Sequence, residues 1–284
     1  MKFGVVIFPT DYSIDPVSIA KEVEARGFDS LWFPEHTHIP VSRRTPWPGG
    51  ADLPQEYWHT YDPFIALTAA AMVTEKIRLG TGISLVMEHD PIVLAKTIAS
   101  VDNISNGRFN FGVGGGWNEE EMENHGTDPK RRFKVLRERI EAMKAIWAND
   151  EAEYHGEFVD FDPIWSWPKP VQKPNPPVYV GGNGEHTLKR VIKYGDAWMP
   201  IAMRGGKPLS EAIPELQQMA QEAGRGRIPV GAYGVQPREE IISHYMEIGV
   251  DEGIFWLPSA GPDVVLPMLD NYATLSESAA KAGA

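Results

Sequence analysis

Cysteine is absent from this chain of 284 residues. Disulfide bonds, thiolate nucleophiles, iron–sulfur clusters and cysteine-ligated zinc are therefore excluded. Basic side chains are also scarce, with 27 Lys and Arg against 39 Asp and Glu and a formal net charge of −12. Because binding to a phosphate backbone depends on clustered Lys and Arg, we expect no nucleic-acid partner.

Long hydrophobic runs are missing as well, although 42% of the residues are hydrophobic. No segment approaches the ~20 consecutive apolar residues that a membrane-spanning helix needs, so no membrane partner is expected. Residues 1–9 carry a single charge and a very short apolar run, which we interpret as a first buried strand rather than a signal peptide. The sequence thus predicts a cytoplasmic protein.

Short apolar runs alternate with segments of helical period along the whole chain. The predicted strands cover residues 2–8, 30–34, 77–85, 109–113, 178–180, 196–200, 228–233 and 253–257. The predicted helices cover residues 15–26, 63–74, 91–104, 129–148, 185–194, 208–223, 237–248 and 262–275. Eight strand–helix units indicate an α/β fold, the (β/α)8 TIM barrel, forming one domain over residues 1–284. A doubly wound open sheet is the alternative, but its G-x-G-x-x-G turn does not follow the first strand.

The alternation is interrupted after the fourth helix, at about residues 150–177. Residues 152–161 predict a small hairpin that turns at residues 155–156, and residues 163–177 are rich in Pro and Trp. Because apolar strands resume directly afterwards, we interpret this segment as an insertion lying on the barrel rather than a linker between domains.

Two predicted strands run directly into glycine-rich turns. Residues 108–118 read Arg-Phe-Asn-Phe-Gly-Val-Gly-Gly-Gly-Trp-Asn, and residues 178–184 read Val-Tyr-Val-Gly-Gly-Asn-Gly. Glycine lets the backbone approach a ligand closely, and the N–H groups that begin a helix can bind an anion. Either turn alone could be an ordinary tight turn, but the pair favours a site for a phosphate-bearing cofactor.

Two further segments make the pattern more specific. They read Gly-Phe-Asp-Ser-Leu-Trp-Phe-Pro-Glu-His at residues 27–36 and Ile-Arg-Leu-Gly-Thr-Gly-Ile at residues 77–83. In their order and spacing, the four segments resemble the bacterial luciferase-like monooxygenase superfamily. The resemblance is greatest to the branch that uses coenzyme F420, a 5-deazaflavin, and it spans nearly the whole chain.

The resemblance implies roles at the matched positions. His36 would lie against the polar edge of the deazaflavin ring, and His36 and Glu35 are the candidate catalytic residues. A loop histidine bonded to the backbone is the alternative for His36. Gly82 and Ile83 match the place where the family carries a non-prolyl cis peptide, with an ordinary β-bulge as the alternative.

The other implied cofactor contacts follow the glycine turns. Asn118 would bond the ribityl chain, while the N–H groups after the fifth strand would hold the phosphate. The complete set of implied cofactor-binding residues is His36, Gly82, Ile83, Gly115, Gly116, Asn118, Gly181, Gly182 and Asn183.

Charged residues outside this set are interpreted more simply. Glu35, His36 and His38 lie close in sequence but do not form a complete ligand set, so no metal site is predicted. The acidic run at residues 119–121, with Glu123, is interpreted as a solvated helix start where negative charge suits the helix dipole.

The resemblance implies an oxidoreductase that transfers hydride between F420 and an unidentified small-molecule substrate, with a homodimer as the expected assembly. An FMN-dependent two-component monooxygenase is the first alternative, opposed by the scarcity of arginine near the phosphate turn, where Lys189, Arg190 and Lys193 follow. A non-catalytic cofactor-binding protein is the second, and an aldolase or isomerase barrel is the third. Residues 39–61 and 154–176 are expected to roof the site.

Overall fold

Eight parallel strands form the centre of the computed structural model, which describes residues 1–50, 52–202 and 204–282. They are β1 (Lys2–Val6), β2 (Ser30–Phe33), β3 (Arg78–Thr81), β4 (Phe109–Val113), β7 (Val178–Gly181), β8 (Ala197–Met199), β9 (Gly231–Val235) and β10 (Glu252–Trp256). Their order is β8-β7-β4-β3-β2-β1-β10-β9. Isolated parallel bridges pair Trp198 with Val230 and Ile201 with Tyr233, and so join β8 to β9. The predicted (β/α)8 barrel is confirmed.

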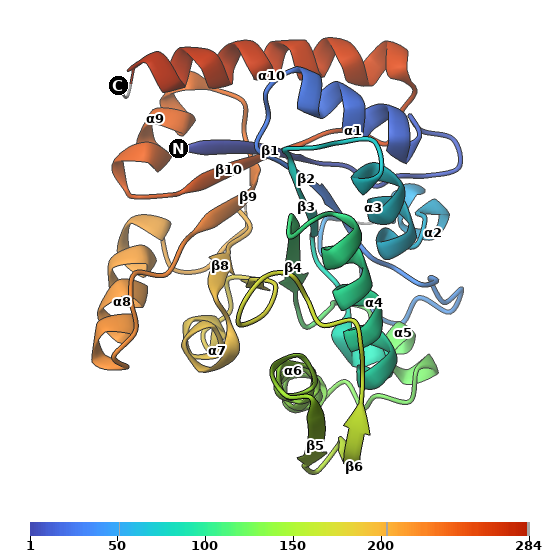
Figure 1. Cartoon of the computed structure of the whole chain (residues 1–284). Helices are drawn as coiled ribbons and strands as arrows, with labels where there is room; N and C mark the ends of the chain where they lie inside the picture. Colours follow the sequence, from blue (N-terminus) through green and yellow to red (C-terminus); the bar gives the residue numbers. More distant parts are fainter. Residues whose placement is uncertain (51, 203, 283–284) are drawn as a thin grey trace.

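Helices alternate with these strands and cover the outside of the ring (Figure 1). They are α1 (Pro16–Ala25), α3 (Pro63–Ala71), α4 (Pro91–Ile104), α6 (Arg132–Ala148), α7 (Thr187–Tyr194), α8 (Leu209–Glu222), α9 (Glu239–Glu247) and α10 (Pro262–Ala282). The first three of them begin with proline after a capping aspartate: Asp15, Asp62 and Asp90 each accept a backbone N–H of the first turn. Proline at the first helical position needs no hydrogen bond there, so this pair of residues defines each helix start.

The interior of the barrel is filled by a small cluster of side chains, which are Val6, Trp32, Met199, Tyr233 and Ile254. A larger apolar cluster lies between the strands and the surrounding helices. The packed interior leaves the carboxyl edge of the strands as the place where loops can build a site.

Two short elements in the loops at that edge were not predicted from the sequence: α2 (Glu56–His59) and the 3-10 turn η1 (Val86–Glu88). A third, α5 (Glu119–Asn124), begins where the acidic run was interpreted as a helix start. The predicted third strand, residues 77–85, is shorter in the structure: β3 ends at Thr81, a cis peptide follows between Gly82 and Ile83, and Ser84 makes one isolated bridge to Val113 before η1 begins.

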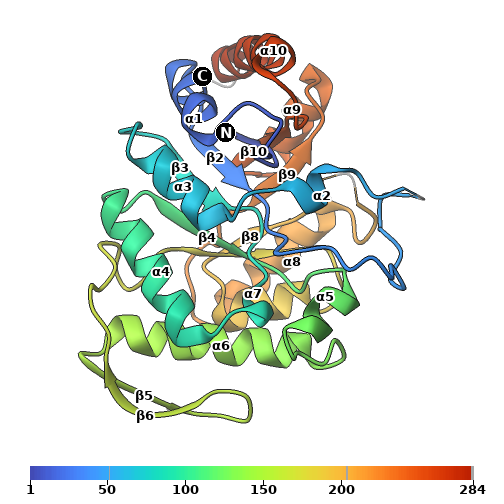
Figure 2. The same cartoon turned by 90° about the vertical axis from the view of Figure 1, so that its right-hand side faces the viewer.

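The predicted hairpin is present: β5 (Glu151–His155) pairs antiparallel with β6 (Asp160–Trp165). It lies outside the barrel beside α6 (Figure 2). The following residues run toward the amino ends of the strands, where the Gln172 amide donates to the carbonyl of Phe109 at 2.6 Å. The expectation that residues 154–176 roof the site is therefore wrong.

The other expected roof, residues 39–61, does reach the carboxyl edge. The ring of Tyr57 lies 5.1 Å from that of His36, and Trp47 packs against Tyr57 at 5.8 Å. Across the described parts of the chain, we find no helix with both the length and the apolar character needed to cross a bilayer.

Candidate functional site

The carboxyl ends of four neighbouring strands bring the sequence-predicted residues to one edge of the ring. Because the strands are parallel and in register, segments that follow them are neighbours in space. Glu35 and His36 follow β2, Gly82 and Ile83 follow β3, residues 114–118 follow β4, and Gly181 to Asn183 end and follow β7.

The two glycine turns meet over a single side chain, that of Ile83. A β-carbon at Gly114 would lie 2.6 Å from Cδ1 of Ile83, and one at Gly181 would lie 3.0 Å from Cγ2 of the same residue. Only glycine leaves room for both turns at this distance. The peptide between Gly82 and Ile83 is cis, in agreement with the resemblance.

Tyr233 supports this segment from across the ring. Its hydroxyl donates to the carbonyl of Gly82, and its ring lies so close that a β-carbon at Gly82 would be 2.8 Å from Cε2. Tyr233 is 9% exposed and lies on β9. The backbone of Gly82, directly before Ile83, is therefore held in place by a residue 151 positions later in the chain.

His36 is held by a buried carboxylate. Its Nδ1 lies 2.7 Å from Oε2 of Glu121, and the two side chains are 7% and 1% exposed. The other oxygen of Glu121 accepts the backbone N–H of Thr37 at 3.1 Å. A carboxylate held by two donors fixes the orientation of the imidazole ring, as in other histidine–carboxylate pairs.

The second ring nitrogen of His36 is an acceptor. The indole N–H of Trp117, which can only donate, points at Nε2 from 3.4 Å. Nδ1 therefore carries the proton that bonds Glu121, and Nε2 is unprotonated, with a lone pair that accepts the long bond from Trp117. The rings of Phe8 and Tyr57 pack beside the imidazole at 6.4 and 5.1 Å, so this lone pair lies among aromatic side chains.

The interpretation of the acidic run as a solvated helix start is wrong for two of its members. Glu120 and Glu121 are 4% and 0% exposed, whereas Glu119 and Glu123 are exposed. Glu120 accepts the hydroxyl of Thr45 at 2.5 Å and thereby ties down the roof segment. Loop segments that fold back over α5 bury these carboxylates, and the local sequence carries no sign of that.

Glu35 is buried and fully occupied by donors. Its carboxylate accepts Ser84 Oγ at 2.8 Å, the N–H of Leu85 at 2.6 Å and His89 Nε2 at 2.7 Å. Burial opposes its charge, but the hydrogen bond and charge of His89, with the other donors, hold the pKa of Glu35 below its ordinary range. In this structure Glu35 fastens the loop after β3.

Glu88 is a buried carboxyl group without a partner. Its side chain is 1% exposed, and neither oxygen makes a hydrogen bond to any described residue. His125 Nε2 approaches to 3.8 Å. Burial, together with the charges of Glu121 and Glu35, raises the pKa of Glu88 to about 9. Glu88 is therefore a neutral acid at pH 7, next to the carboxylate that holds His36.

Asn118 and the glycines before it shape the turn after β4. Asn118 is 3% exposed and caps α5, accepting the N–H of Glu121 at 3.4 Å. Gly116 has a φ of +61°, in the left-handed region. A β-carbon at Gly115 would lie 2.4 Å from the ring of Phe133. Asn118 thus positions the helix that carries Glu121.

The turn after β7 is tied to the next strand. The N–H of Gly182 donates to the carbonyl of Met199 at 3.1 Å, and the Asn183 amide bonds both the N–H and the carbonyl of Ile201. The backbone N–H groups of Asn183 and Gly184 make no hydrogen bond to the described residues. Of the residues that the resemblance implied for the phosphate, Asn183 therefore has an open N–H and Gly182 does not, and the N–H of Gly184 is open as well.

Two arginines stand beside the first glycine turn. The guanidinium groups of Arg190 and Arg132 lie 3.5 and 5.1 Å from the ring centre of Phe133, the ring that packs on Gly115. Burial lowers the pKa of Arg190. Positive charge is thus present near the glycine edge, which the sequence had left undetermined.

Sequence reasoning missed Glu121 and Tyr233 as members of this constellation. Glu121 is the third helical residue after an asparagine cap, a position where a carboxylate typically bonds the cap, and it bonds His36 instead.

Over the part of the chain that the structure describes, no three His, Asp or Glu side chains are grouped so that they could hold a metal ion.

The chain is similar to several known proteins. Residues 1–236 match the family model of luciferase-like monooxygenases. An uncharacterized protein of Mycobacterium tuberculosis is 44% identical over 278 residues, which cover 96% of this chain and 98% of that protein.

Three solved structures share the fold at identities of 19–21%. A monooxygenase of Streptomyces bottropensis has a TM-score of 0.80 over 96% of this chain and 98% of its own. An F420-dependent secondary alcohol dehydrogenase with an F420–acetone adduct has a TM-score of 0.76 over 97% and 98%. The oxygenating constituent of 3,6-diketocamphane monooxygenase from Pseudomonas putida, in complex with FMN, has a TM-score of 0.66 over 88% and 72%.

Proposed function

Because this chain belongs to the luciferase-like monooxygenase family, we propose that it is an oxidoreductase that exchanges hydride between coenzyme F420 and a small organic substrate. The observation that carries the proposal is the His36 imidazole, held by Glu121 and presenting Nε2 beside the glycine-lined edge. One relative of the same fold is itself an F420-dependent alcohol dehydrogenase, which supports this choice of coenzyme.

The residues at the carboxyl edge fit a planar ring with a phosphate tail. Glycine is needed at positions 114, 115 and 181, because a β-carbon at any of them would come within 3.0 Å of the side chain of Ile83 or Phe133. We assign the ring to the side of Ile83 and His36. Asn183 and Gly184, with Arg190 nearby, would hold the phosphate.

When bound, the deazaflavin supplies a carbon that gives or takes hydride and reacts poorly with oxygen. The chain supplies the proton. His36 Nε2 takes the hydroxyl proton of an alcohol substrate, or returns it to a carbonyl, and Glu121 stabilises the positive charge that forms on the ring. Phe8, Tyr57 and Trp117 surround this nitrogen and limit the access of water.

Titration of the purified protein with F420 and, separately, with FMN tests the coenzyme. We expect saturable binding of F420 that is tighter than any binding of FMN. Saturable FMN binding without F420 binding would overturn the proposal. Oxidation of a panel of secondary alcohols, followed by the absorbance change of F420, then tests the direction and the substrate class.

An FMN-dependent monooxygenase is the second candidate function. The specific observation in its favour is the pair Arg190 and Arg132 at the ring of Phe133, because a compact phosphate is readily held by arginine. Oxygen consumption with reduced FMN, lost in Arg190→Ala, would support this candidate over the first.

We also propose a homodimer formed through α3 and α4. These adjacent helices expose apolar side chains to solvent: Ile65 is 73%, Met72 72% and Val93 64% exposed. Several such side chains on one face mark an interaction surface. Sedimentation should show a dimer that Ile65→Lys with Val93→Lys dissociates, whereas Val41→Lys, at a distant exposed valine, leaves it intact. A monomeric wild-type protein at micromolar concentration would contradict this assembly.

A further inference from the structure

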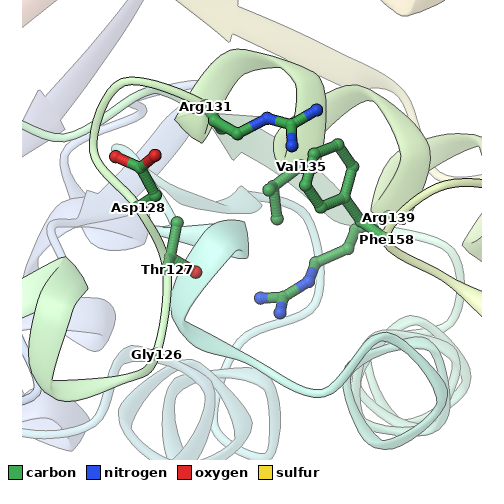
Figure 3. A pocket seen from close by; sticks show the side chains of 7 residues that line it. All are labelled: Gly126, Thr127, Asp128, Arg131, Val135, Arg139 and Phe158. Atoms are coloured by element: carbon green, nitrogen blue, oxygen red, sulfur yellow. The ribbon is translucent and has the colours of Figure 1, made fainter.

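A cavity of about 440 Å³ lies outside the barrel, away from the residues of the candidate site. It is bounded by the loop after α5, by the first turns of α6 and by Phe158 from the turn of the hairpin (Figure 3). Nothing in the proposed hydride transfer uses this cavity.

Arg139 places an unpaired positive charge in the cavity. Its guanidinium points into the space between Thr127 and Val135 (Figure 3). Among the described residues it makes one hydrogen bond, from Nη1 to the carbonyl of Val86 at 3.0 Å, and no ion pair, while its Nε is buried without a partner. Burial lowers the pKa of Arg139, and the carboxylate of Asp90 acts on its guanidinium only from beyond ion-pair distance. A partly buried guanidinium without a direct ion pair is unfavourable, and a bound anion would offset that cost.

A second arginine and an aromatic ring complete the walls. Arg131 lies two turns earlier on the same face of α6, stacks over the ring of Phe158 at 4.5 Å and pairs with Glu157. On the other side of the cavity, Asp128 Oδ1 already accepts the N–H of Lys130 at 2.9 Å. The cavity is thus cationic at its base, apolar along one wall and acidic on the opposite side.

We propose that this cavity is a second, non-catalytic site that binds a small molecule through a carboxylate or phosphate group, with the anionic group on Arg139. Nε and Nη2 of the planar guanidinium make no hydrogen bond to the described residues, and such an edge suits either group in a bidentate bond. The negative charge of Asp128 repels a second anionic group on that side, so the ligand carries its negative charge at one end. Phe158 takes an apolar part of the ligand.

The site is connected to the loop that backs the candidate active site. Arg139 holds the carbonyl of Val86, and Thr127 Oγ1 donates to the carbonyl of Met87 at 2.6 Å. Both carbonyls belong to η1, whose last residue is Glu88 and which is followed directly by His89. An anion on Arg139 therefore binds against the turn that positions these two side chains.

Calorimetric titration of the full chain with inorganic phosphate and with butyrate, a monocarboxylate, tests the inference without any cofactor, and variants of Arg139 separate this site from phosphate binding at Asn183 and Gly184. We expect saturable binding of at least one anion, and the tighter of the two identifies the ligand group. The Arg139→Gln substitution should weaken the binding of that anion at least tenfold, and Arg139→Lys should weaken it by a smaller factor. Arg137→Gln, on the same helix but outside the cavity, should leave it unchanged.

A second readout uses the wild-type protein, in case Arg139→Gln fails to fold. The Nε–H resonance of Arg139 should shift during the titration in proportion to the bound fraction. Absence of saturable binding of both anions, or binding that moves no resonance of Arg139, would overturn the inference.

Discussion

An oxygen of Glu121 lies 2.7 Å from Nδ1 of His36, which joins side chains 85 residues apart in the sequence. Through this bond, a helix after β4 determines which nitrogen of a histidine after β2 is available for chemistry. The same helix is capped by Asn118, so the cap, the carboxylate and the imidazole act as one unit.

Replacing Glu121 by Gln should reverse the tautomer of His36. The amide would donate to Nδ1, so the ring proton would move to Nε2 and the lone pair for proton transfer would be lost. We expect a fall in hydride-transfer rate of about 100-fold. Nitrogen chemical shifts of the His36 ring report the tautomer without a substrate. Glu119→Gln, at the exposed residue of the same turn, should change neither quantity.

Glu88 should make the protein less stable as the pH rises. Its pKa of about 9 exceeds the ~4.3 of an unfolded chain, so the folded state binds one more proton between these values. Its contribution to the free energy of unfolding is complete below pH ~4 and falls by ~1.4 kcal/mol per pH unit until pH ~9. Urea unfolding at pH 6, 7 and 8 should show this slope in the wild type and a reduced slope in Glu88→Gln. Equal slopes in both proteins would show that Glu88 is ionised.

The pair of His89 and Glu35 should be most stabilising at mildly acidic pH, between ~4.3 and ~6.5. Burial opposes the charge of His89, but the bond to Glu35 raises its pKa, so its contribution is present below the unfolded value of ~6.5 and lost as the pH rises through the folded value. The pKa of Glu35 is lowered, so the contribution of its charge is present above the unfolded value of ~4.3 and is lost as the pH falls through the folded value.

Removing His89 should therefore leave a buried charge short of one partner. His89→Ala is expected to lower the free energy of unfolding by ~3 kcal/mol at pH 6, measured by urea denaturation. His59→Ala, which removes a histidine from the exposed pair with Asp11, serves as the matched control and should cost under ~1 kcal/mol. A similar loss in both variants would contradict the role of Glu35.

Gly181→Ala should weaken cofactor binding while the barrel still folds. Its new methyl group would lie 3.0 Å from Ile83 and 3.3 Å from the carbonyl of Val113, so the floor of the site must move by a few tenths of an ångström. We expect at least tenfold weaker binding of the coenzyme with an unchanged circular dichroism spectrum. Gly226→Ala, where no atom lies within 4 Å of the new methyl group, should bind normally.

Most of the fold could be predicted because each barrel strand is a continuous apolar run with its own helix. The starts of α1, α3 and α4 are encoded locally by an aspartate and a proline, and they were predicted to within a residue. The last helix continues to Ala282, seven residues beyond the prediction, because Ala, Glu and Lys there favour a helix. The short helix α2 has no side-chain cap, so no local signal marks its start.

The sequence predicted the candidate site only at residues that belong to one of the four recognised segments. The glycine turns and His36 lie where the sequence segments placed them. Glu120 and Glu121 were read as solvated, because their burial depends on how residues 36–45 fold over α5. Glu35 follows the same strand as His36, yet its partners Ser84, Leu85 and His89, which lie on either side of η1, could be identified only in three dimensions.

The bond from the Tyr233 hydroxyl to the Gly82 carbonyl spans 151 residues of sequence. During synthesis, the segment containing Ile83 emerges long before β9 exists, so a nascent chain has the glycine turns without the hydrogen bond from Tyr233. Coenzyme capture should consequently begin only after residue 233 has left the ribosome, and fragments ending before β9 should not be expected to retain it.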